Sequence, residues 1–167
     1  DELGMRSRSP RWAIAGKFKA QQVTSKIINI SVQVGRTGAL TPVAKVKPVY
    51  VSGVTVTNIT LHNQDEINRK DIRIGDNVLI ERSGDVIPKI IKVVSRKNEG
   101  SPKFKIDSSC PACSYPAVKL EDEAITRCVN PDCTAKLIGK IQHFSSKLAM
   151  NIEGLGIKII EQLFDNH

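Results

Sequence analysis

The chain has 167 residues, of which 40% are hydrophobic and 25% are charged, as in ordinary soluble globular proteins. It is long enough for one domain or two small ones. No apolar run approaches the roughly 20 residues that a membrane-spanning helix requires, and the N-terminal stretch has no apolar segment of the signal-peptide type. The composition therefore excludes a membrane-spanning helix, and we expect no membrane partner. The absence of an initiator Met suggests a segment of a longer protein.

The net charge of +8 is concentrated in the first 97 residues. Residues 1–22 carry five Lys or Arg against two Asp or Glu, and residues 23–97 carry twelve against six. Residues 98–167 carry eight against nine. Such a concentration of positive charge favours a polyanionic partner, with nucleic acid first. A basic surface without such a partner is the alternative.

The stretch RSPRWAIAGKF, residues 8–18, alternates apolar and polar side chains. Trp12, Ile14 and Phe18 fall on one side of the chain, which predicts a half-buried strand over residues 9–18. A strand this short needs pairing partners, and its own neighbourhood offers none.

Residues 23–97 have the alternation of an all-β module. The stretch KIINISVQVG predicts a strand with one apolar face, made of Ile28, Ile30, Val32 and Val34. The stretch TPVAKVKPVYVSGVTVTNITL predicts two short strands, with breaks at Pro48 and at Ser52–Gly53.

One short helix is predicted within HNQDEINRKDI, where Asn and Asp favour a helix start and His62 has a capping or packing role. The stretch RIGDNVLIERSGDVIPKIIKVV predicts two more strands joined by SGD. About five strands and one short helix favour an OB-fold, a small barrel that commonly binds oligonucleotides. A β-sandwich is the alternative on pattern alone.

The four cysteines follow one pattern after a linker at residues 98–108: Cys110-x2-Cys113, fourteen residues, then Cys128-x4-Cys133. Two such pairs of thiolates can surround one tetrahedral Zn²⁺. Two disulfides are disfavoured because the chain has no secretory signal. Four thiolates also close the coordination shell, so we expect structural rather than catalytic zinc.

The C-terminal part predicts two helices joined by a tight turn. Residues 137–150 space four apolar side chains as a helical stripe, namely Leu137, Ile141, Phe144 and Leu148. Gly154-Leu155-Gly156 then leads into a helix that contains Ile159, Ile160 and Leu163. The backbone amides of this turn could hold a DNA phosphate, and an ordinary helix connection is the alternative.

Two loops of the predicted barrel carry candidate DNA contacts. GRTG places Arg36 and Thr37 between glycines, which suits a phosphate contact. ERSGDVIP presents Arg82 and then Val86 and Ile87. Exposed apolar tips can press into a minor groove, but packing at a strand start is the reading that the residues alone favour. No arrangement of Ser, His, Cys or carboxylates indicates an acid–base or nucleophilic centre.

Taken together, these stretches resemble bacterial NAD-dependent DNA ligase over essentially the whole chain. The motifs occur in the same order: LGMRSRSPRWAIAGKF, GRTGALTPVAKVKPV, TLHNQDEI, DIRIGDNVLIERSGDVIP, the four-Cys spacing and HFSSKLAMNIEGLG. In that family a nucleotidyltransferase domain takes AMP from NAD onto a lysine. The AMP then passes to a 5′-phosphate at a nick, and the 3′-hydroxyl attacks to seal it.

The resemblance implies four segments. Residues 1–22 would end the nucleotidyltransferase domain, with Lys17 contacting the AMP phosphate and Arg11 near that site. Residues 23–97 would form the OB-fold, residues 98–136 the linker and zinc module, and residues 137–167 the start of a helix-hairpin-helix domain. The family's adenylated lysine lies in a Lys-x-Asp-Gly motif, which this chain lacks. We therefore expect the isolated chain to be inactive and to bind neither NAD nor Mg²⁺, which belong to the whole enzyme.

The resemblance also implies the site residues and the partners. Five barrel residues fall at DNA-contacting positions, which reverses the packing interpretation of Val86 and Ile87: Arg36, Thr37, Arg82, Val86 and Ile87. Gly154 and Gly156 would contact DNA from the helical part, and the zinc ligands would be Cys110, Cys113, Cys128 and Cys133. The expected partners are nicked duplex DNA and the nucleotidyltransferase domain of the same enzyme.

We further expect a monomer in the bacterial cytoplasm, associated with the nucleoid and acting in replication and repair. The alternative is a stand-alone OB-fold plus zinc-ribbon module for single-stranded nucleic acid. The aromatic content of 4% speaks against it, because single-strand platforms stack bases on aromatic side chains.

Overall fold

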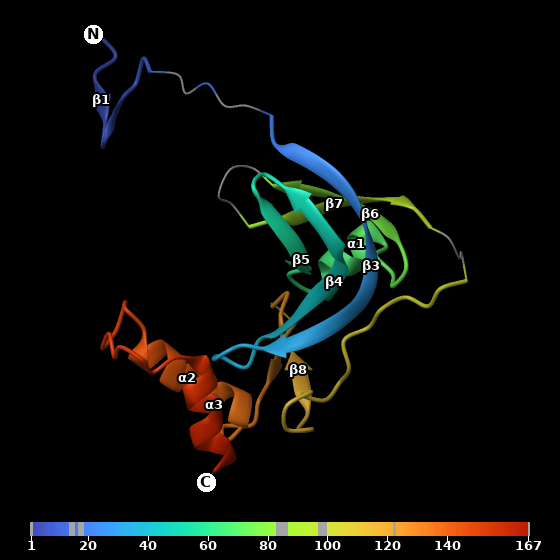
Figure 1. Ribbon diagram of the computed structural model, residues 1–167, viewed down its shortest axis with the longest axis vertical. Helices are drawn as coiled ribbons and strands as arrows, with labels where there is room; N and C mark the ends of the chain where they lie inside the picture. The colour runs from blue at the N-terminus through green and yellow to red at the C-terminus, as the bar shows by residue number, and fades with distance from the viewer. Residues whose placement is uncertain are drawn as a thin grey trace.

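The computed structural model describes residues 2–13, 16, 19–82, 87–96, 100–121 and 123–166. A five-stranded barrel lies at its centre, a small cysteine-bearing hairpin lies beside one end of the barrel, and two helices follow (Figure 1). Among the described residues, no helix is long and apolar enough to cross a membrane.

The barrel consists of antiparallel strands in the order β5-β4-β3-β6-β7. Its edge strands β5 and β7 also contact each other, so the sheet nearly closes on itself. One short helix, α1, lies between β5 and β6 in the chain. This architecture confirms the predicted OB-fold over the β-sandwich. The bounds of its elements are β3 Gln21–Val34, β4 Leu40–Val51, β5 Val54–Thr60, α1 Gln64–Lys70, β6 Asn77–Arg82 and β7 Lys89–Ser95.

Strand β3 contains a bulge that the alternation of its sequence does not reveal. Ile27 pairs with Val46, whereas Asn29 pairs with the adjacent Lys45, so one residue of β3 is inserted. Such an insertion exchanges the two faces of a strand. The prediction for Ile28 was therefore wrong, since this residue is 48% exposed and Ile27 fills the core in its place, whereas Ile30 is buried as predicted.

Strand β4 runs through Pro48, where the sequence predicted a break. The register shift between Lys45 and Val49 absorbs the proline, because the missing N–H falls where the ladder is already interrupted. The predicted break at Ser52–Gly53 is confirmed as the turn to β5, where both residues have positive φ.

Helix α1 contributes Ile67 to the barrel core, with its side chain 2% exposed. Asn63 caps the helix, since its side-chain oxygen accepts a hydrogen bond of 2.9 Å from the Glu66 amide. His62 is exposed and does not cap, so the capping or packing role predicted for it was wrong.

A buried carboxylate joins the end of β7 to the start of β6. Asp76 is 1% exposed and accepts hydrogen bonds from Arg96 Nε at 2.9 Å, Arg96 Nη2 at 3.0 Å and the Arg73 amide at 2.9 Å. Arg96 also pairs with Asp71 at 2.8 Å. Arg73 Nη1 reaches the Ser101 carbonyl at 2.7 Å. This network therefore fixes the chain where it leaves the barrel.

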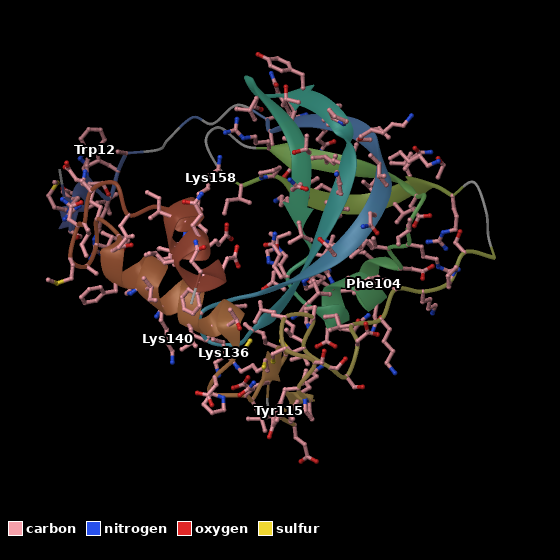
Figure 2. The ribbon with its side chains drawn as sticks, turned by 60° about the horizontal axis from the view of Figure 1, so that its bottom comes forward. Trp12, Phe104, Tyr115, Lys136, Lys140 and Lys158 are labelled. Carbon is pink, nitrogen blue, oxygen red and sulfur yellow. The ribbon has the colours of Figure 1, made fainter. Side chains whose placement is uncertain are left out.

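The described part of the predicted linker, residues 100–108, has no helix or strand but is docked on the barrel. The side chain of Gln64 donates to the Phe104 carbonyl at 3.0 Å and accepts from the Ile106 amide at 2.8 Å. Phe104 packs against the barrel core beside α1, as Figure 2 shows. The segment is thus a fixed strap rather than a free connection.

The N-terminal strand prediction was wrong in the described residues. The only strands there are β1, Met5–Arg6, and β2, Ser9–Pro10, which pair with each other away from the barrel (Figure 1). Trp12 is 56% exposed rather than half-buried. Two-residue strands bury almost nothing, so alternation alone cannot hold this stretch in a sheet. Ile14, Lys17 and Phe18 lie outside the described residues.

The cysteines lie on and next to a hairpin of β8, Ala117–Lys119, and β9, Thr126–Cys128. Helix α2 then spans Thr134–Ser145 and helix α3 spans Ile157–Asp165. Helix α2 starts earlier and ends earlier than predicted. Phe144 of α2 is 55% exposed, and Leu148, predicted to lie on the same helix, is in the turn after it and is 96% exposed. In α3 only Ile160 is buried.

We predict that Asp76→Asn lowers the free energy of unfolding by about 3 kcal/mol, because it leaves Arg96 without its buried counter-charge. Urea unfolding at neutral pH measures this change. Asp65→Asn is the matched control, since it breaks an exposed ion pair with Lys119 and should cost no more than about 1 kcal/mol. Equal losses in the two variants would contradict a special role for Asp76.

We also predict that the protein loses stability in acid, and that protonation of Asp71 contributes to this loss. The hydrogen bond from Arg96, and next that from Arg73, lower the pKa of Asp71 in the folded protein. A carboxyl group whose pKa is lower in the folded than in the unfolded protein stabilises the fold at pH values above its unfolded pKa, which is about 3.9 for Asp. This stabilisation is lost as the pH falls through the pKa of the folded protein. The urea midpoint should therefore fall below about pH 4. This fall should be smaller in Asp71→Asn, and identical pH curves for both proteins would refute the assignment.

Candidate metal centre and nucleic-acid interface

The four cysteines converge on one point, with their sulfur atoms all within 4.8 Å of one another. The Sγ atoms of Cys110 and Cys133 are 3.9 Å apart, and those of Cys113 and Cys128 are 3.6 Å apart. A tetrahedral zinc with Zn–S bonds of about 2.3 Å requires S···S edges of about 3.8 Å. These sulfur separations are well beyond a disulfide bond length of about 2.05 Å, so the geometry favours a metal site over two disulfides. The donor set therefore fits Zn²⁺.

Local structure brings each sulfur to this point. The first pair lies in a turn closed by the Ser114 amide, which donates to the Cys110 carbonyl at 2.8 Å. Cys128 ends β9, and Cys133 is the N-cap of α2. A zinc ion held by four thiolates would have a structural role, because its coordination shell leaves no position for a reacting water.

The metal-free thiols have unequal acidity. A backbone hydrogen bond from Tyr115 lowers the pKa of Cys113 to about 7. Burial raises the pKa of Cys128 to about 12 and also raises the pKa of Cys133. Because a thiol must lose its proton to bind zinc, metal uptake at Cys128 and Cys133 would release protons.

Arg36 and Thr37 lie in the β3–β4 turn, which we call the GRTG turn (residues 35–38). Two backbone hydrogen bonds close the turn: the Gly35 amide donates to the Ala39 carbonyl at 2.9 Å, and the Gly38 amide donates to the Gly35 carbonyl at 2.8 Å. The side chains of Arg36 and Thr37 are exposed. The turn lies between the zinc module and α2.

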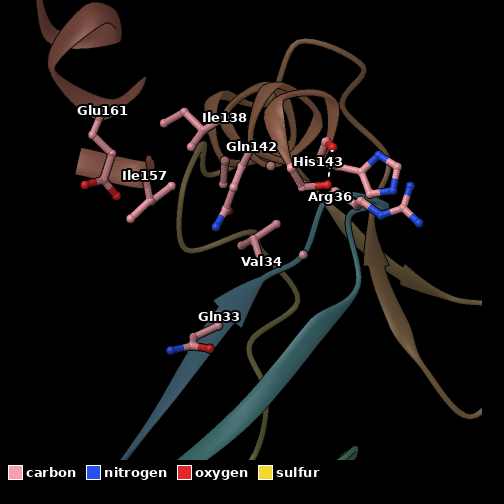
Figure 3. Close-up of a pocket in the computed structure, with 12 residues that line it drawn as sticks. Gln33, Val34, Arg36, Ile138, Gln142, His143, Ile157 and Glu161 are labelled. Atoms are coloured by element: carbon pink, nitrogen blue, oxygen red, sulfur yellow. Dashed lines mark hydrogen bonds between the residues drawn. The ribbon is translucent and has the colours of Figure 1, made fainter. Parts of the chain in front are cut away.

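A groove of about 690 Å³ is lined by the end of β3, the GRTG turn and the two C-terminal helices. Arg36 and His143 lie beside each other at one end of it, and Ile157 and Glu161 line the other end (Figure 3). His143 is carried by α2. No local pattern pairs it with Arg36, because more than a hundred residues separate the two in the chain.

Arg82 and Ile87 lie together at the other end of the barrel. Both line a shallow groove along β5, and Ile87 is 72% exposed. Arg82 is partly buried, and its Nη1 donates to the Ser52 carbonyl at 2.6 Å, so it also holds the β4–β5 turn. Val86 lies outside the described residues.

The two groups of predicted DNA contacts thus lie near opposite ends of one strand. Arg82 pairs with Gln21 at the start of β3, and Arg36 follows the end of the same 14-residue strand. At a rise of about 3.3 Å per residue, the path along this strand is about 46 Å. The sequence suggested no such separation.

The remaining predicted site residues have open surroundings. The turn at Gly154 has a φ of 80°, and the space where a side chain of Gly154 or Gly156 would begin is empty within 4 Å. Ser145 holds this turn by donating to the Leu155 carbonyl at 3.2 Å. Arg11 is exposed after the N-terminal hairpin. Lys17 lies outside the described residues.

The barrel carries a surplus of positive charge on its surface. Every acidic residue that the structure describes between positions 23 and 96 is in an ion pair: Asp65, Glu66, Asp71, Asp76 and Glu81. Within the same described residues, no salt bridge involves five of the cations, namely Lys26, Arg36, Lys45, Lys47 and Lys92. These cations are available to a polyanion.

Comparison with known proteins identifies both modules. Residues 24–102 match the family model of the NAD-dependent DNA ligase OB-fold domain, and residues 109–135 match that of the NAD-dependent DNA ligase C4 zinc finger domain. The chain belongs to the NAD-dependent DNA ligase family. The resemblance seen in the sequence is thereby confirmed, and so is structural zinc in the C4 module.

Relatives of this ligase segment match along nearly its whole length. The DNA ligase of Bdellovibrio bacteriovorus is 55% identical over 99% of the chain, and that of Desulfosudis oleivorans is 53% identical over 98%. The DNA ligase of Myxococcus xanthus is 54% identical over 96%. The chain spans about a quarter of the length of these curated relatives, with 25%, 24% and 24% covered respectively.

We predict that a chelator removes one zinc per chain and unfolds the zinc module while the barrel stays folded. The cysteine cluster packs separately from the barrel core, and so small a module depends on its metal. Limited proteolysis after chelation should cut within residues 109–135 and leave residues 23–95 intact. Cys128→Ser should give the same pattern without chelator. An unchanged digestion pattern in metal-free protein would contradict this role for zinc.

Proposed function

We propose that this chain is the DNA-binding part of an NAD-dependent DNA ligase that seals nicks in duplex DNA during replication and repair. The observation that carries the proposal is the collinear match of an OB-fold and a C4 zinc finger to that family, within relatives named DNA ligase along nearly the whole chain. The cysteine cluster beside the barrel supports it, because it builds the second matched module in space.

In the whole protein, AMP passes from NAD to an enzyme lysine and then to the 5′-phosphate at the nick. Attack by the 3′-hydroxyl on that phosphate forms the phosphodiester bond and releases AMP. Lys17 is assigned to the AMP phosphate and Arg11 to its vicinity. The 167 residues hold no Lys-x-Asp-Gly motif, so they do not accept AMP themselves. NAD and Mg²⁺ act in the whole enzyme.

The barrel binds DNA mainly through its phosphates. The surplus of exposed cations supports this, because each phosphate contact releases a condensed counterion and so favours binding. Arg36 and Thr37 contact the backbone at one end of the barrel. Arg82, Val86 and Ile87 do so at the other end, where the exposed Ile87 side chain suits the wall of a minor groove.

Duplex rather than single-stranded DNA is the substrate that the barrel suits. Its one aromatic residue is Tyr50, whereas single-strand platforms stack successive bases on several aromatic rings. The nick in the bound duplex is the site at which the whole enzyme acts.

We propose that the chain is divided into four segments. Residues 1–22 end the nucleotidyltransferase domain and residues 23–97 form the OB-fold. Residues 98–136 form the strap and zinc module. Residues 137–167 begin a helix-hairpin-helix domain, whose turn at Gly154 and Gly156 contacts a phosphate. The protein acts as a monomer in the bacterial cytoplasm, at the nucleoid.

We predict that the chain binds nicked and intact duplex more tightly than single strand, with an affinity that falls steeply between about 50 and 200 mM salt. Arg36→Ala should weaken binding and reduce the slope of log K against log salt by about one, as expected for one lost phosphate contact. Fluorescence anisotropy with labelled oligonucleotides measures both quantities.

Arg69→Ala is the control for this measurement. Arg69 is exposed but already paired with Glu66 at 2.8 Å, so its loss should leave the slope nearly unchanged. A clear preference for single strand would instead favour a stand-alone nucleic-acid-binding module. Equal slopes for the Arg36 and Arg69 variants would remove Arg36 from the interface.

A further inference from the structure

We infer that the zinc module holds the GRTG turn in place, and that Gly38 and Gly139 are the positioning residues of this joint. The inference rests on the proposed function, in which Arg36 and Thr37 of this turn contact DNA. It adds a role for the metal site at a distance: folding of the zinc module orders a loop of the barrel.

The first contact joins the turn to a cysteine ligand. The Cys128 amide donates to the Gly38 carbonyl at 2.9 Å, and Ala39 and Arg127 form an isolated antiparallel bridge beside it. Strand β9 thus pairs with the chain at the end of the GRTG turn. A side chain at Gly38 would begin 2.5 Å from the Cys128 carbonyl oxygen, so only glycine allows this approach.

The second contact is made by helix α2 on the other side of the turn. A Cβ atom on Gly139 would lie 3.0 Å from both Cα and Cβ of Arg36. Helix α2 itself begins at a cysteine ligand, because Cys133 is its N-cap and accepts the Leu137 amide at 3.0 Å. Both neighbours of the turn are therefore anchored at cysteines of the metal site.

Side chains reinforce the joint. Arg127 donates to the Thr37 hydroxyl at 3.2 Å and is oriented by Glu123, whose carboxylate lies 2.8 Å from Arg127 Nε. Lys136 lies against Gly38 and donates to the Asn130 carbonyl at 2.8 Å, within the loop between the last two cysteines. These contacts on Thr37 and Gly38 come from the segment between residues 123 and 136.

Zinc should therefore order the turn without touching it. The internal hydrogen bonds of the GRTG turn, from Gly35 and Gly38, close only a small loop. If the zinc module unfolds, the turn loses its neighbours on two sides, and Arg36 loses the backbone frame from which it projects. The barrel core, which packs separately, keeps its structure.

Amide hydrogen exchange tests this coupling in the absence of DNA. We expect the Gly35 and Gly38 amides to exchange at least tenfold faster after zinc is chelated, with full recovery when zinc is restored. The amides of Ile27 and Val46 in the barrel should keep their rates and report that the barrel is folded. Unchanged exchange at Gly35 and Gly38 in zinc-free protein would overturn the inference.

Gly38→Ala and Gly53→Ala form a matched pair of variants. Both glycines have a φ of +83°, so alanine strains the backbone equally at the two positions, but nothing lies within 4 Å of a Cβ at Gly53. We expect Gly38→Ala to release zinc to a chelator at least tenfold faster than the parent, and Gly53→Ala to release it at the parent rate. Equal release rates in the two variants would overturn the inference.

Gly139→Ala keeps the test decisive if Gly38→Ala fails to fold. Alanine favours a helix over glycine, so α2 should form at least as well, and only the contact with Arg36 becomes tighter. We expect amide shift changes at residues 35–38 and weaker duplex binding, with zinc retained. Unchanged shifts at residues 35–38 would count against the joint.

The two proposals fail separately. If the chain binds no duplex but its turn amides exchange faster without zinc, the inferred role of the zinc module holds and the proposed function is wrong. If removing zinc changes neither duplex affinity nor the exchange rates of the turn amides, the inferred role of the zinc module is wrong. The salt dependence of binding would then still support the proposed function.

Discussion

The close approach of Gly38 to Cys128 is the contact on which the arrangement of the two modules depends. It joins a turn of the barrel to a strand that ends in a metal ligand, and it brings the two backbones nearer than any side chain would allow. Because α2 starts at another ligand, the same metal site also determines where the C-terminal helices begin. A small four-thiolate cluster thus organises the barrel turn, the hairpin and the helical part around itself.

A second attachment comes from the strap between the barrel and the cysteines. Gln64 holds its backbone on α1, and Arg73 holds its first part at Ser101. The buried Asp76 keeps Arg73 and Arg96 in place, and Lys119 of the hairpin reaches Asp65 of α1 at 3.0 Å. The zinc module is therefore tied to the barrel at two separate places. Because there are two attachments, the zinc module cannot rotate freely about either of them.

This arrangement places the candidate DNA contacts at the two ends of one long strand. Arg36 and Thr37 follow the end of β3, beside the zinc module, whereas Arg82 and Ile87 lie near its start. Contacts spread in this way suit an extended polyanion better than a small ligand, because a phosphate backbone presents charge at regular intervals along its length. In the described part of the barrel, four lysines take part in no salt bridge and would add attraction to such a polyanion without sequence preference: Lys26, Lys45, Lys47 and Lys92.

The sequence by itself determined those features that depend on local spacing. Cysteine intervals predicted the metal site, because two close thiolate pairs suffice to surround an ion, and alternation with turn residues predicted five strands and α1. Only the tertiary structure decided what depends on distant partners. The bulge beside Ile27 exposes Ile28, and a register shift accommodates Pro48. In the described part of the N-terminal stretch, Ser9 and Pro10 pair with Met5 and Arg6 and with no barrel strand. The roles of Gly38, Gly139 and Asp76 are set by atoms far away in the chain, which no local pattern can report.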